Sequence, residues 1–188
     1  MITTPDATRL TPEQYLQLEA DRPLKHEYRN GKTYAMAGTT DSHNLIAGNL
    51  YNLIRSRLRG SLCRVYFADV KARLDDCNCF YYPDLMVTCD SRDTETSTYK
   101  GYPKLIVEVL SESTEAFDRG DKFIDYQTLP TLEEYVLVSS KQQRVECYCR
   151  TKQGLWVFQF YVPSQNTFHL TSIDLETTFG ELYEDVSL

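Results

Sequence analysis

The chain has 188 residues, of which 41% are hydrophobic and 25% are charged, a composition typical of a globular protein with its own core. Its net charge of -7 argues against a protein that coats nucleic acid through a broad basic surface, although a bound divalent cation would add positive charge locally. No apolar run approaches the roughly 18 residues that span a bilayer, and the first residues lack the pattern of a signal peptide. We therefore expect a single domain, residues 1–188, located in the cytoplasm and not bound to a membrane.

The chain begins with signals for a helix and a hairpin. Residues 11–14, Thr-Pro-Glu-Gln, combine an N-cap, a proline at the first helical position and a capping box, so a helix is predicted from 11 to about 20. The dipeptide Asn30-Gly31 favours a type I′ turn, which needs positive φ at both residues. It predicts a hairpin between the segments 25–29 and 32–36.

A second helix is predicted over residues 41–59. Its apolar side chains, among them Ile46, Leu50 and Ile54, recur at the spacing of one helix face, and Gly60 is a suitable residue to end it.

After Gly60 the pattern changes to that of strands. Residues 63–74 alternate, a turn at 75–78 leads into a second strand at 80–88, and a polar loop follows. The nearly continuous apolar run 104–110 is typical of a central strand that is covered on both faces. Together with the two earlier helices and the hairpin, this order predicts an α/β (α+β) domain with a mixed central sheet flanked by helices. The remaining predicted elements are a helix from 113 or 114 to 129 and strands at 134–139, 144–150, 155–162 and 168–173.

Glu108 is the first residue that indicates chemistry, because it is a carboxylate inside the apolar run 104–110. An unpaired carboxylate in a buried strand costs several kcal/mol, on the order of the penalty for an isolated buried charge, so a partner must compensate for it. A bound cation would do so. Two structural alternatives remain open: Glu108 points from the strand end into solvent, or it pairs with an arginine.

Asp84 strengthens the case for a cation. It follows Pro83 at the point where the apolar strand segment begins, and neighbouring strands could present Asp84 and Glu108 side by side. Two carboxylates that face one cavity repel each other unless a proton or a divalent cation lies between them. Oxygen ligands of this kind suit Mg²⁺, which completes its shell with water and substrate phosphate. Taken alone, Asp84 fits a turn or cap position equally well.

Lys122 lies on the predicted helix that follows Glu108. Tyr126 is one turn further along the same face, and Asp118 is one turn earlier. An ammonium near two carboxylates could hold the attacking water or neutralise a phosphate. The alternative is an ordinary solvated lysine.

Several short motifs, taken in order, resemble the Uma-type endonuclease family, which belongs to the PD-(D/E)XK restriction-endonuclease-like superfamily. An N-terminal segment, 26–32 with Met36 and His43, is similar as well, and the resemblance covers about Thr11 to Val138. The motifs that carry it are Tyr82-Pro83-Asp84-Leu85, the segment 103–111, Asp121-Lys122 with Tyr126, and the segment 134–138.

The resemblance implies a restriction-endonuclease-like fold, hydrolysis of phosphodiester bonds in DNA, dependence on Mg²⁺ (or Mn²⁺) and a homodimer. It implies metal binding by Asp84 and Glu108, with the Val109 carbonyl as a further ligand. The catalytic lysine of the superfamily usually stands two residues after the glutamate, where this chain has Leu110. Proteins of this kind carry the lysine on the following helix instead, which points to Lys122.

The same resemblance suggests roles for two residues nearer the N-terminus. Glu27 would add a carboxylate to the cluster, and His43 would contact the scissile phosphate or orient a water molecule. The alternatives are a cross-strand ion pair between Glu27 and Lys32, and a cap or surface position for His43.

Two rival functions follow from other features. Leu110 and the acidic net charge favour a catalytically inactive nuclease-like fold that binds nucleic acid or a protein partner. The pairs Cys77-x-Cys79 and Cys147-x-Cys149 would suit a tetrahedral zinc site in an interaction module, although their spacing is tighter than in common zinc knuckles. We expect the six cysteines to be reduced and mostly buried as small hydrophobic side chains.

Overall fold

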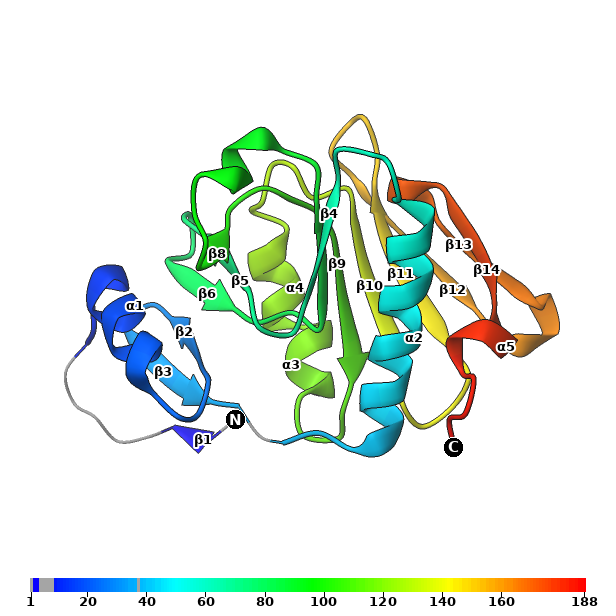
Figure 1. Ribbon diagram of the computed structural model, residues 1–188, viewed down its shortest axis with the longest axis horizontal. Helices are drawn as coiled ribbons and strands as arrows, with labels where there is room; N and C mark the ends of the chain where they lie inside the picture. Colours follow the sequence, from blue (N-terminus) through cyan, green and yellow to red (C-terminus); the bar gives the residue numbers. More distant parts are fainter. Residues whose placement is uncertain (1, 4–8, 37) are drawn as a thin grey trace.

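Two six-stranded sheets form the framework of the computed structural model, which describes residues 2–3, 9–36 and 38–188 (Figure 1). The sheet that we call the central sheet has the strand order β12-β11-β10-β9-β7-β4. Its middle strand β9 pairs in parallel with β10 and antiparallel with β7, which confirms the predicted mixed sheet. The central strands are β4 (Arg64–Phe67), β7 (Leu85–Thr88), β9 (Pro103–Leu110), β10 (Glu134–Ser139), β11 (Val145–Arg150) and β12 (Trp156–Tyr161).

The second sheet, which we call the wing sheet, has the order β1-β3-β2-β6-β5-β8 and includes the N-terminal hairpin. Asn30 and Gly31 have φ values of 47° and 90°, as the predicted type I′ turn requires. The helix α1 (Pro12–Asp21) begins with the predicted capping box, in which Thr11 and Gln14 bond to each other's backbone N–H groups. The wing strands are β1 (Ile2–Thr3), β2 (His26–Arg29), β3 (Lys32–Ala35), β5 (Lys71–Leu74), β6 (Cys79–Tyr81) and β8 (Tyr99–Lys100).

Helices cover both faces of the central sheet (Figure 1). On one face, the apolar side of α2 (Asp41–Arg57) packs against the odd-numbered residues of β9, together with the C-terminal segment. On the other face, α4 (Asp121–Tyr126) packs against the even-numbered residues of β9. The C-terminal segment consists of β13 (Thr167–Leu170), a 3-10 turn, β14 (Leu175–Thr178) and α5 (Phe179–Leu182), which follows β14 directly.

Two predicted strands are each divided between the two sheets. The segment predicted as one strand at 63–74 forms β4 and β5, and the segment 80–88 forms β6 and β7. Ala68 breaks the first because it adopts a left-handed φ of 48°, and Pro83 breaks the second because it has no N–H for a sheet ladder. The chain therefore crosses from the central sheet to the wing sheet and back.

The helix predicted from 113 or 114 to 129 is two short helices, α3 (Glu115–Arg119) and α4. Gly120 separates them, because its ψ of -103° lies outside the range of helical residues. The strand β14 and the helix α5 were not predicted, because elements of four residues each leave no long periodic pattern. The polar loop after β7 contains a 3-10 helix at Ser91–Thr94 and the short β8.

The expectation that all cysteines are free is wrong for one pair. Cys63 and Cys89 form a disulfide, with their Cα atoms 4.0 Å apart. They flank β4 and β7, where Arg64 is the cross-strand partner of Thr88, so the strand register places the two cysteines opposite each other. The other four cysteines are free thiols, and two of them are buried.

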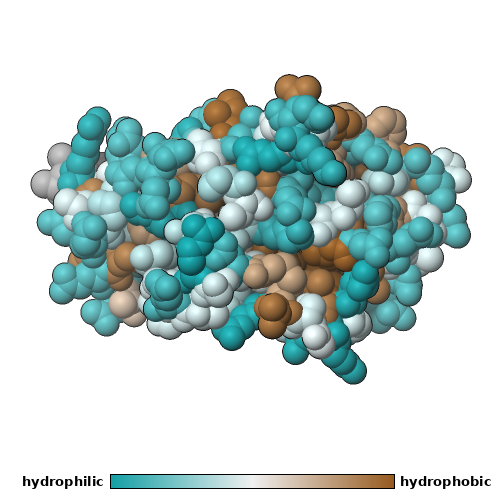
Figure 2. Space-filling view, turned by 90° about the horizontal axis from the view of Figure 1, so that it is seen from above, coloured by the Kyte–Doolittle hydropathy of each residue, from teal (hydrophilic) through white to brown (hydrophobic). Residues whose placement is uncertain are grey.

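Hydrophilic residues cover most of the face seen in Figure 2, and hydrophobic residues interrupt it in separate spots. Among the described residues, no helix is both long enough and apolar enough to cross a membrane.

Candidate active site

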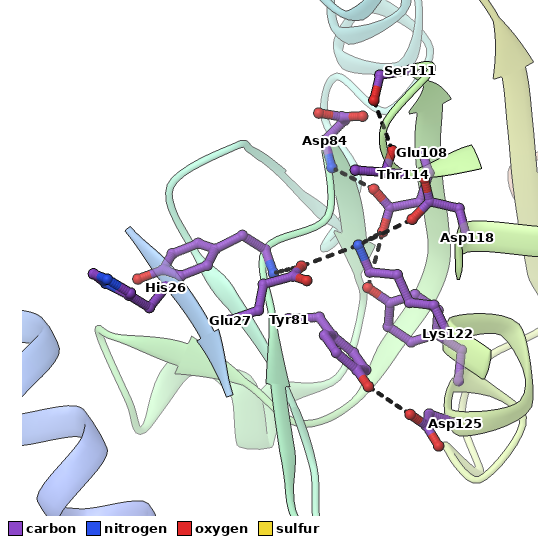
Figure 3. Close-up of polar contacts among 12 residues, drawn as sticks. His26, Glu27, Tyr81, Asp84, Glu108, Ser111, Thr114, Asp118, Lys122 and Asp125 are labelled. Carbon is purple, nitrogen blue, oxygen red and sulfur yellow. Dashed lines mark hydrogen bonds and ion pairs between the residues drawn. The ribbon is translucent and has the colours of Figure 1, made fainter. Parts of the chain in front are cut away.

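The strand register explains why the predicted acids meet. Leu85 of β7 is the cross-strand partner of Val107 of β9, so Asp84, the residue before Leu85, lies beside Glu108. The backbone N–H of Asp84 points to Glu108 Oε2 at 3.4 Å. Asp84 stands where the chain returns from the wing sheet to the central sheet, and Figure 3 shows it next to Glu108. The structure thus brings both acids to one place.

Glu108 is buried, with only 4% of its surface exposed. It faces the α4 side of the central sheet, because Ile106 and Leu110, two residues away on either side, pack in the core on that side. Its Oε1 lies 2.9 Å from Lys122 Nζ and accepts a hydrogen bond of 3.1 Å from the Tyr126 hydroxyl. Both alternatives from the sequence, solvent and an arginine, are excluded: the partner is a lysine.

Lys122 lies at the centre of three carboxylates (Figure 3). Besides Glu108, its Nζ is 3.1 Å from Glu27 Oε1 and 3.5 Å from Asp118 Oδ1. Glu27 projects from β2 of the wing sheet and also accepts a hydrogen bond from the backbone N–H of Tyr82. The ammonium therefore joins α3, α4 and both sheets, and it is not a solvated surface group.

These charges shift one another's pKa values. Burial raises the pKa of Glu108 well above its usual range, and although Lys122 opposes this shift, the carboxylates of Asp118, Asp84 and Glu27 add to it. Burial disfavours the charge on Lys122, but the surrounding carboxylates, Glu108 first, raise its pKa well above the usual value. The site holds more negative charge than its single ammonium offsets.

Asp84 has a different set of partners. Its Oδ2 accepts a hydrogen bond of 2.7 Å from the backbone N–H of Val109 and lies 3.2 Å from His43 Nε2. His43 is in the first turn of α2, after the N-cap Thr40. Burial opposes protonation of His43, but Asp84, with help from the Val109 backbone, raises the pKa of the imidazole above its usual range. His43 is thus part of the site and not merely a surface residue.

Tyr126 contacts the site from the protein core. It is fully buried, and its hydroxyl contacts Glu108, while burial and the nearby Glu108 raise its pKa well above the usual value. The hydroxyl of this buried phenol faces Glu108 and not the protein surface. Asp118 was noted from the sequence only by its helical spacing to Lys122, and the structure places its carboxylate 3.5 Å from the Lys122 ammonium.

The donor set fits a hard divalent cation. Asp84 and Glu108 supply two carboxylates from adjacent strands, and the Val109 backbone lies beside Asp84. Mg²⁺ is usually held by one or two carboxylates and takes its other ligands from water and phosphate. The surplus of carboxylates that raises the pKa of Glu108 is the condition that a cation would relieve.

The four-cysteine zinc site is not formed. Cys147 packs in the core on the α2 side of the central sheet, whereas Cys77 and Cys79 pack on the α4 side. Instead, Cys77 and Cys79 lie beside Asp125, with their ligand atoms all within 4.8 Å, the one such group of three among the described residues. Asp125 is already bound by Arg29 at 2.8 Å and by the Tyr81 hydroxyl at 2.5 Å.

Two curated relatives are similar to the chain over most of their length. One, described as an uncharacterized protein of Synechocystis sp. (strain ATCC 27184 / PCC 6803 / Kazusa), is 38% identical over 179 residues, which cover 95% of this chain and 94% of the relative. A second uncharacterized protein of the same organism is 31% identical over 150 residues, covering 79% of this chain and 85% of the relative.

A solved structure has the same fold. It is a protein from Anabaena variabilis, described as a "putative nuclease belonging to DUF820", with a TM-score of 0.78 and 16% identity over 95% of this chain and 99% of that one. It supports a nuclease-like fold, as the sequence predicted. The model of the Uma2 family, described as "Putative restriction endonuclease", matches residues 12–179. The chain therefore belongs to the Uma2 family, which is the family that its sequence motifs resemble.

Proposed function

We propose that the chain is an endonuclease that hydrolyses phosphodiester bonds of DNA with Mg²⁺ as its metal, which Mn²⁺ can replace. The observation that carries this proposal is Glu108, a carboxylate buried in the central strand that lies beside Asp84 and 2.9 Å from Lys122. The family description and the nuclease-like fold support a function of this class.

The residues of the site have separate roles in this proposal. Asp84 and Glu108, with the Val109 carbonyl, would hold the cation, which when bound activates water and stabilises charge on the phosphate. Lys122 orients the attacking water or neutralises the phosphate, and Glu27 holds the ammonium in place through its contact of 3.1 Å.

His43 and Tyr126 complete the proposed site. His43 lies at the Asp84 side, where its imidazole would contact the scissile phosphate or orient a water molecule. Tyr126 fixes the rotamer of Glu108 through its hydroxyl.

One feature favours a second candidate, a catalytically inactive fold that binds nucleic acid or protein. The usual lysine position is occupied by Leu110, which is buried in the core with 4% exposure. Against this candidate, the Lys122 ammonium reaches Glu108 from the following helix, which restores a cation beside the metal-binding acid.

A cleavage assay on plasmid, linear duplex and single-stranded DNA with Mg²⁺ or Mn²⁺ separates the two candidates. We expect cleavage by the wild type and by Glu133→Gln, since Glu133 is an exposed partner of Lys104 outside the site. Glu108→Gln should lower the rate at least about 100-fold, because loss of groups that only support a metal ligand already costs 10–100-fold. Absence of cleavage by the wild type with either metal would establish the inactive fold.

Metal binding has a readout that does not depend on activity. Mg²⁺ or Mn²⁺ at about 100 times its dissociation constant should raise the free energy of unfolding by about 2.7 kcal/mol in the wild type. Asp84→Asn should lose most of this gain, because one of the two carboxylates is no longer charged. Equal stabilisation of both proteins would mean that the cation binds elsewhere.

We further propose a homodimer, since two sites are suited to cutting both strands of a duplex, and a cytoplasmic location. Sedimentation of the purified protein and fractionation of cells test these two points.

A further inference from the structure

The strand β12 is the last strand of the central sheet, at the end opposite β4 (Figure 1). One of its edges pairs with β11, and no backbone group in the described part of the chain bonds to the other edge. An open edge is a template for a further strand, and proteins usually protect it with a lysine, a proline or a bulge. Residues 155–162 contain no charged residue and no proline, and the β11–β12 pairing runs without a shift in register. This edge therefore lacks these protections.

The side chains of the same strand are apolar and exposed. Val157, Phe158 and Phe160 are 52%, 47% and 49% exposed, and Leu155, just before the strand, is 68% exposed. Trp156 packs against the core on the α4 side of the sheet, so Phe158 and Phe160 lie on that same face. Exposed hydrophobic residues that adjoin one another in this way indicate a surface for a partner.

The hydrogen bonds of the β11–β12 hairpin show which backbone groups of β12 point outward. The Thr151 N–H donates to the Leu155 carbonyl at 2.7 Å, so Leu155 directs its backbone toward β11. Because these groups alternate from side to side along an antiparallel strand, the odd-numbered residues of β12 also bond to β11. The N–H and C=O groups of the even-numbered residues, Trp156, Phe158 and Phe160, point away from the sheet. The three aromatic residues of one face thus carry the open backbone groups.

A second copy of the same strand fits this edge. Two copies related by a two-fold axis pair antiparallel, and the register that places Phe158 opposite Phe158 of the second copy joins the open groups of all three aromatic residues. In that register Trp156 lies opposite Phe160 of the second copy, so every cross-strand pair on this face is aromatic and favourable. The net charge of the chain is -7, but the strand itself is uncharged, so no like charges meet across the axis.

The exposed area is sufficient for a small dimer interface. A large aromatic side chain buries roughly 150–250 Å², so the half-exposed rings of Phe158 and Phe160 expose roughly 100 Å² each. Together with Leu155, Val157 and the strand backbone, each copy would bury on the order of 500 Å², and the two copies about 1,000 Å², which is the lower limit for a specific interface.

We infer that β12 forms the interface of the proposed homodimer. Two copies join their open edges antiparallel about a two-fold axis at Phe158, and their six-stranded central sheets become one continuous sheet. The inference rests on the homodimer of the proposed function and adds its contact surface, but it does not depend on nuclease activity.

Sedimentation velocity of the full chain over a range of concentrations tests the interface. Phe158→Lys removes one ring from each copy and places two like charges at the axis, so the dissociation constant of the dimer should rise at least about 30-fold, the effect of losing one central aromatic anchor. Leu18→Lys is the matched control, because Leu18 is a 44% exposed apolar residue on α1 of the other sheet's side; it should sediment like the wild type.

The outcomes separate the inference from the proposals that it extends. A dimer that Phe158→Lys does not weaken would overturn the inference and leave the homodimer intact. A wild type that is monomeric at every concentration would overturn both and leave DNA cleavage untouched, and the open edge would then fit a strand of another protein.

Cross-linking tests the register and covers the case in which Phe158→Lys does not fold. Cα atoms of a hydrogen-bonded antiparallel pair lie about 5.5 Å apart, within reach of a disulfide, so Phe158→Cys should give a disulfide-linked dimer under mild oxidation. Val157→Cys is the control, since Val157 lies opposite Gln159 of the second copy, and the two Val157 Cα atoms are beyond the limit of about 7 Å. The wild type, with four free thiols, gives the background. Equal cross-linking of the two variants, or none in either, contradicts the inference.

Discussion

At the scale of single residues, the site is an unbalanced cluster of buried charge. Three carboxylates, Glu27, Glu108 and Asp118, surround the one ammonium of Lys122. Pairing reduces the free-energy cost of burying these groups but does not remove it. The free energy of hydration that each ion loses exceeds the attraction that one partner supplies. Each hydrogen bond to a carboxylate of the cluster therefore contributes to stability as well as to geometry.

Removal of the Tyr126 hydroxyl tests whether a hydrogen bond to a carboxylate of the cluster contributes to stability. Tyr126→Phe keeps the ring and leaves Glu108 Oε1 with one donor fewer, so the free energy of unfolding should fall by about 1–3 kcal/mol. Urea denaturation measures it. Tyr51→Phe is the matched control, because its ring packs on Phe67 and its hydroxyl makes no hydrogen bond within the described ranges; it should change stability by less than about 0.5 kcal/mol. Similar losses in both variants would contradict the role given to the Tyr126 hydroxyl.

At the scale of elements, the site depends on where the chain changes sheets. Pro83 ends the wing strand β6 and begins the return to β7, so that Asp84 arrives beside β9. The hairpin β2–β3 brings Glu27 from the other side, and its turn at Asn30-Gly31 fixes the register. A substitution in this turn should therefore act on the hairpin and on Glu27 together.

Substitution of two glycines by alanine should change the free energy of unfolding in opposite directions. Gly31 has a φ of +90°, and an added Cβ would lie 3.0 Å from Arg9 Cβ, so Gly31→Ala should cost about 1–2 kcal/mol. Gly48 lies inside α2 with nothing within 4 Å of an added Cβ, so Gly48→Ala should stabilise by about 0.5–1 kcal/mol. Urea denaturation of both variants decides this. A loss of stability in Gly48→Ala would show that the helix needs the glycine for a reason other than its backbone.

At the scale of the whole molecule, a buried carboxylate links the C-terminal segment to the central sheet. Glu134 of β10 is fully buried and accepts hydrogen bonds from Thr171 N at 3.1 Å, Ser172 N at 2.8 Å and Ser172 Oγ at 2.7 Å. These bonds fix the turn between β13 and β14 to the central sheet. The segment in turn completes the core on the α2 side of the sheet.

Glu134→Gln should lower the free energy of unfolding by about 1–3 kcal/mol, because one carboxylate oxygen becomes a donor that faces other donors. Its neighbour Glu133 provides the control: its side chain is 53% exposed and pairs with Lys104, so Glu133→Gln should cost at most about 1 kcal/mol. Urea denaturation of the two variants compares them directly. Equal costs would mean that the C-terminal segment is held mainly by its apolar contacts.

The sequence by itself determined the elements with strong local signals. The capping box of α1, the Asn30-Gly31 turn, the long face of α2 and the apolar strand β9 were all predicted, because each depends on residues close in the chain. Glu108 was visible as a charge in an apolar run. The motifs around it identified the family, and the fold class followed.

Only the tertiary structure decided which distant residues meet. The division of the segments 63–74 and 80–88 between two sheets depends on pairing partners far along the chain, which a local alternation of side chains cannot specify. The same is true of the contact of His43 with Asp84, of Glu27 with Lys122, and of the Cys63–Cys89 pair. Local patterns set the φ and ψ of each segment, whereas the place of each charge in the site is set by long-range packing that no single segment encodes.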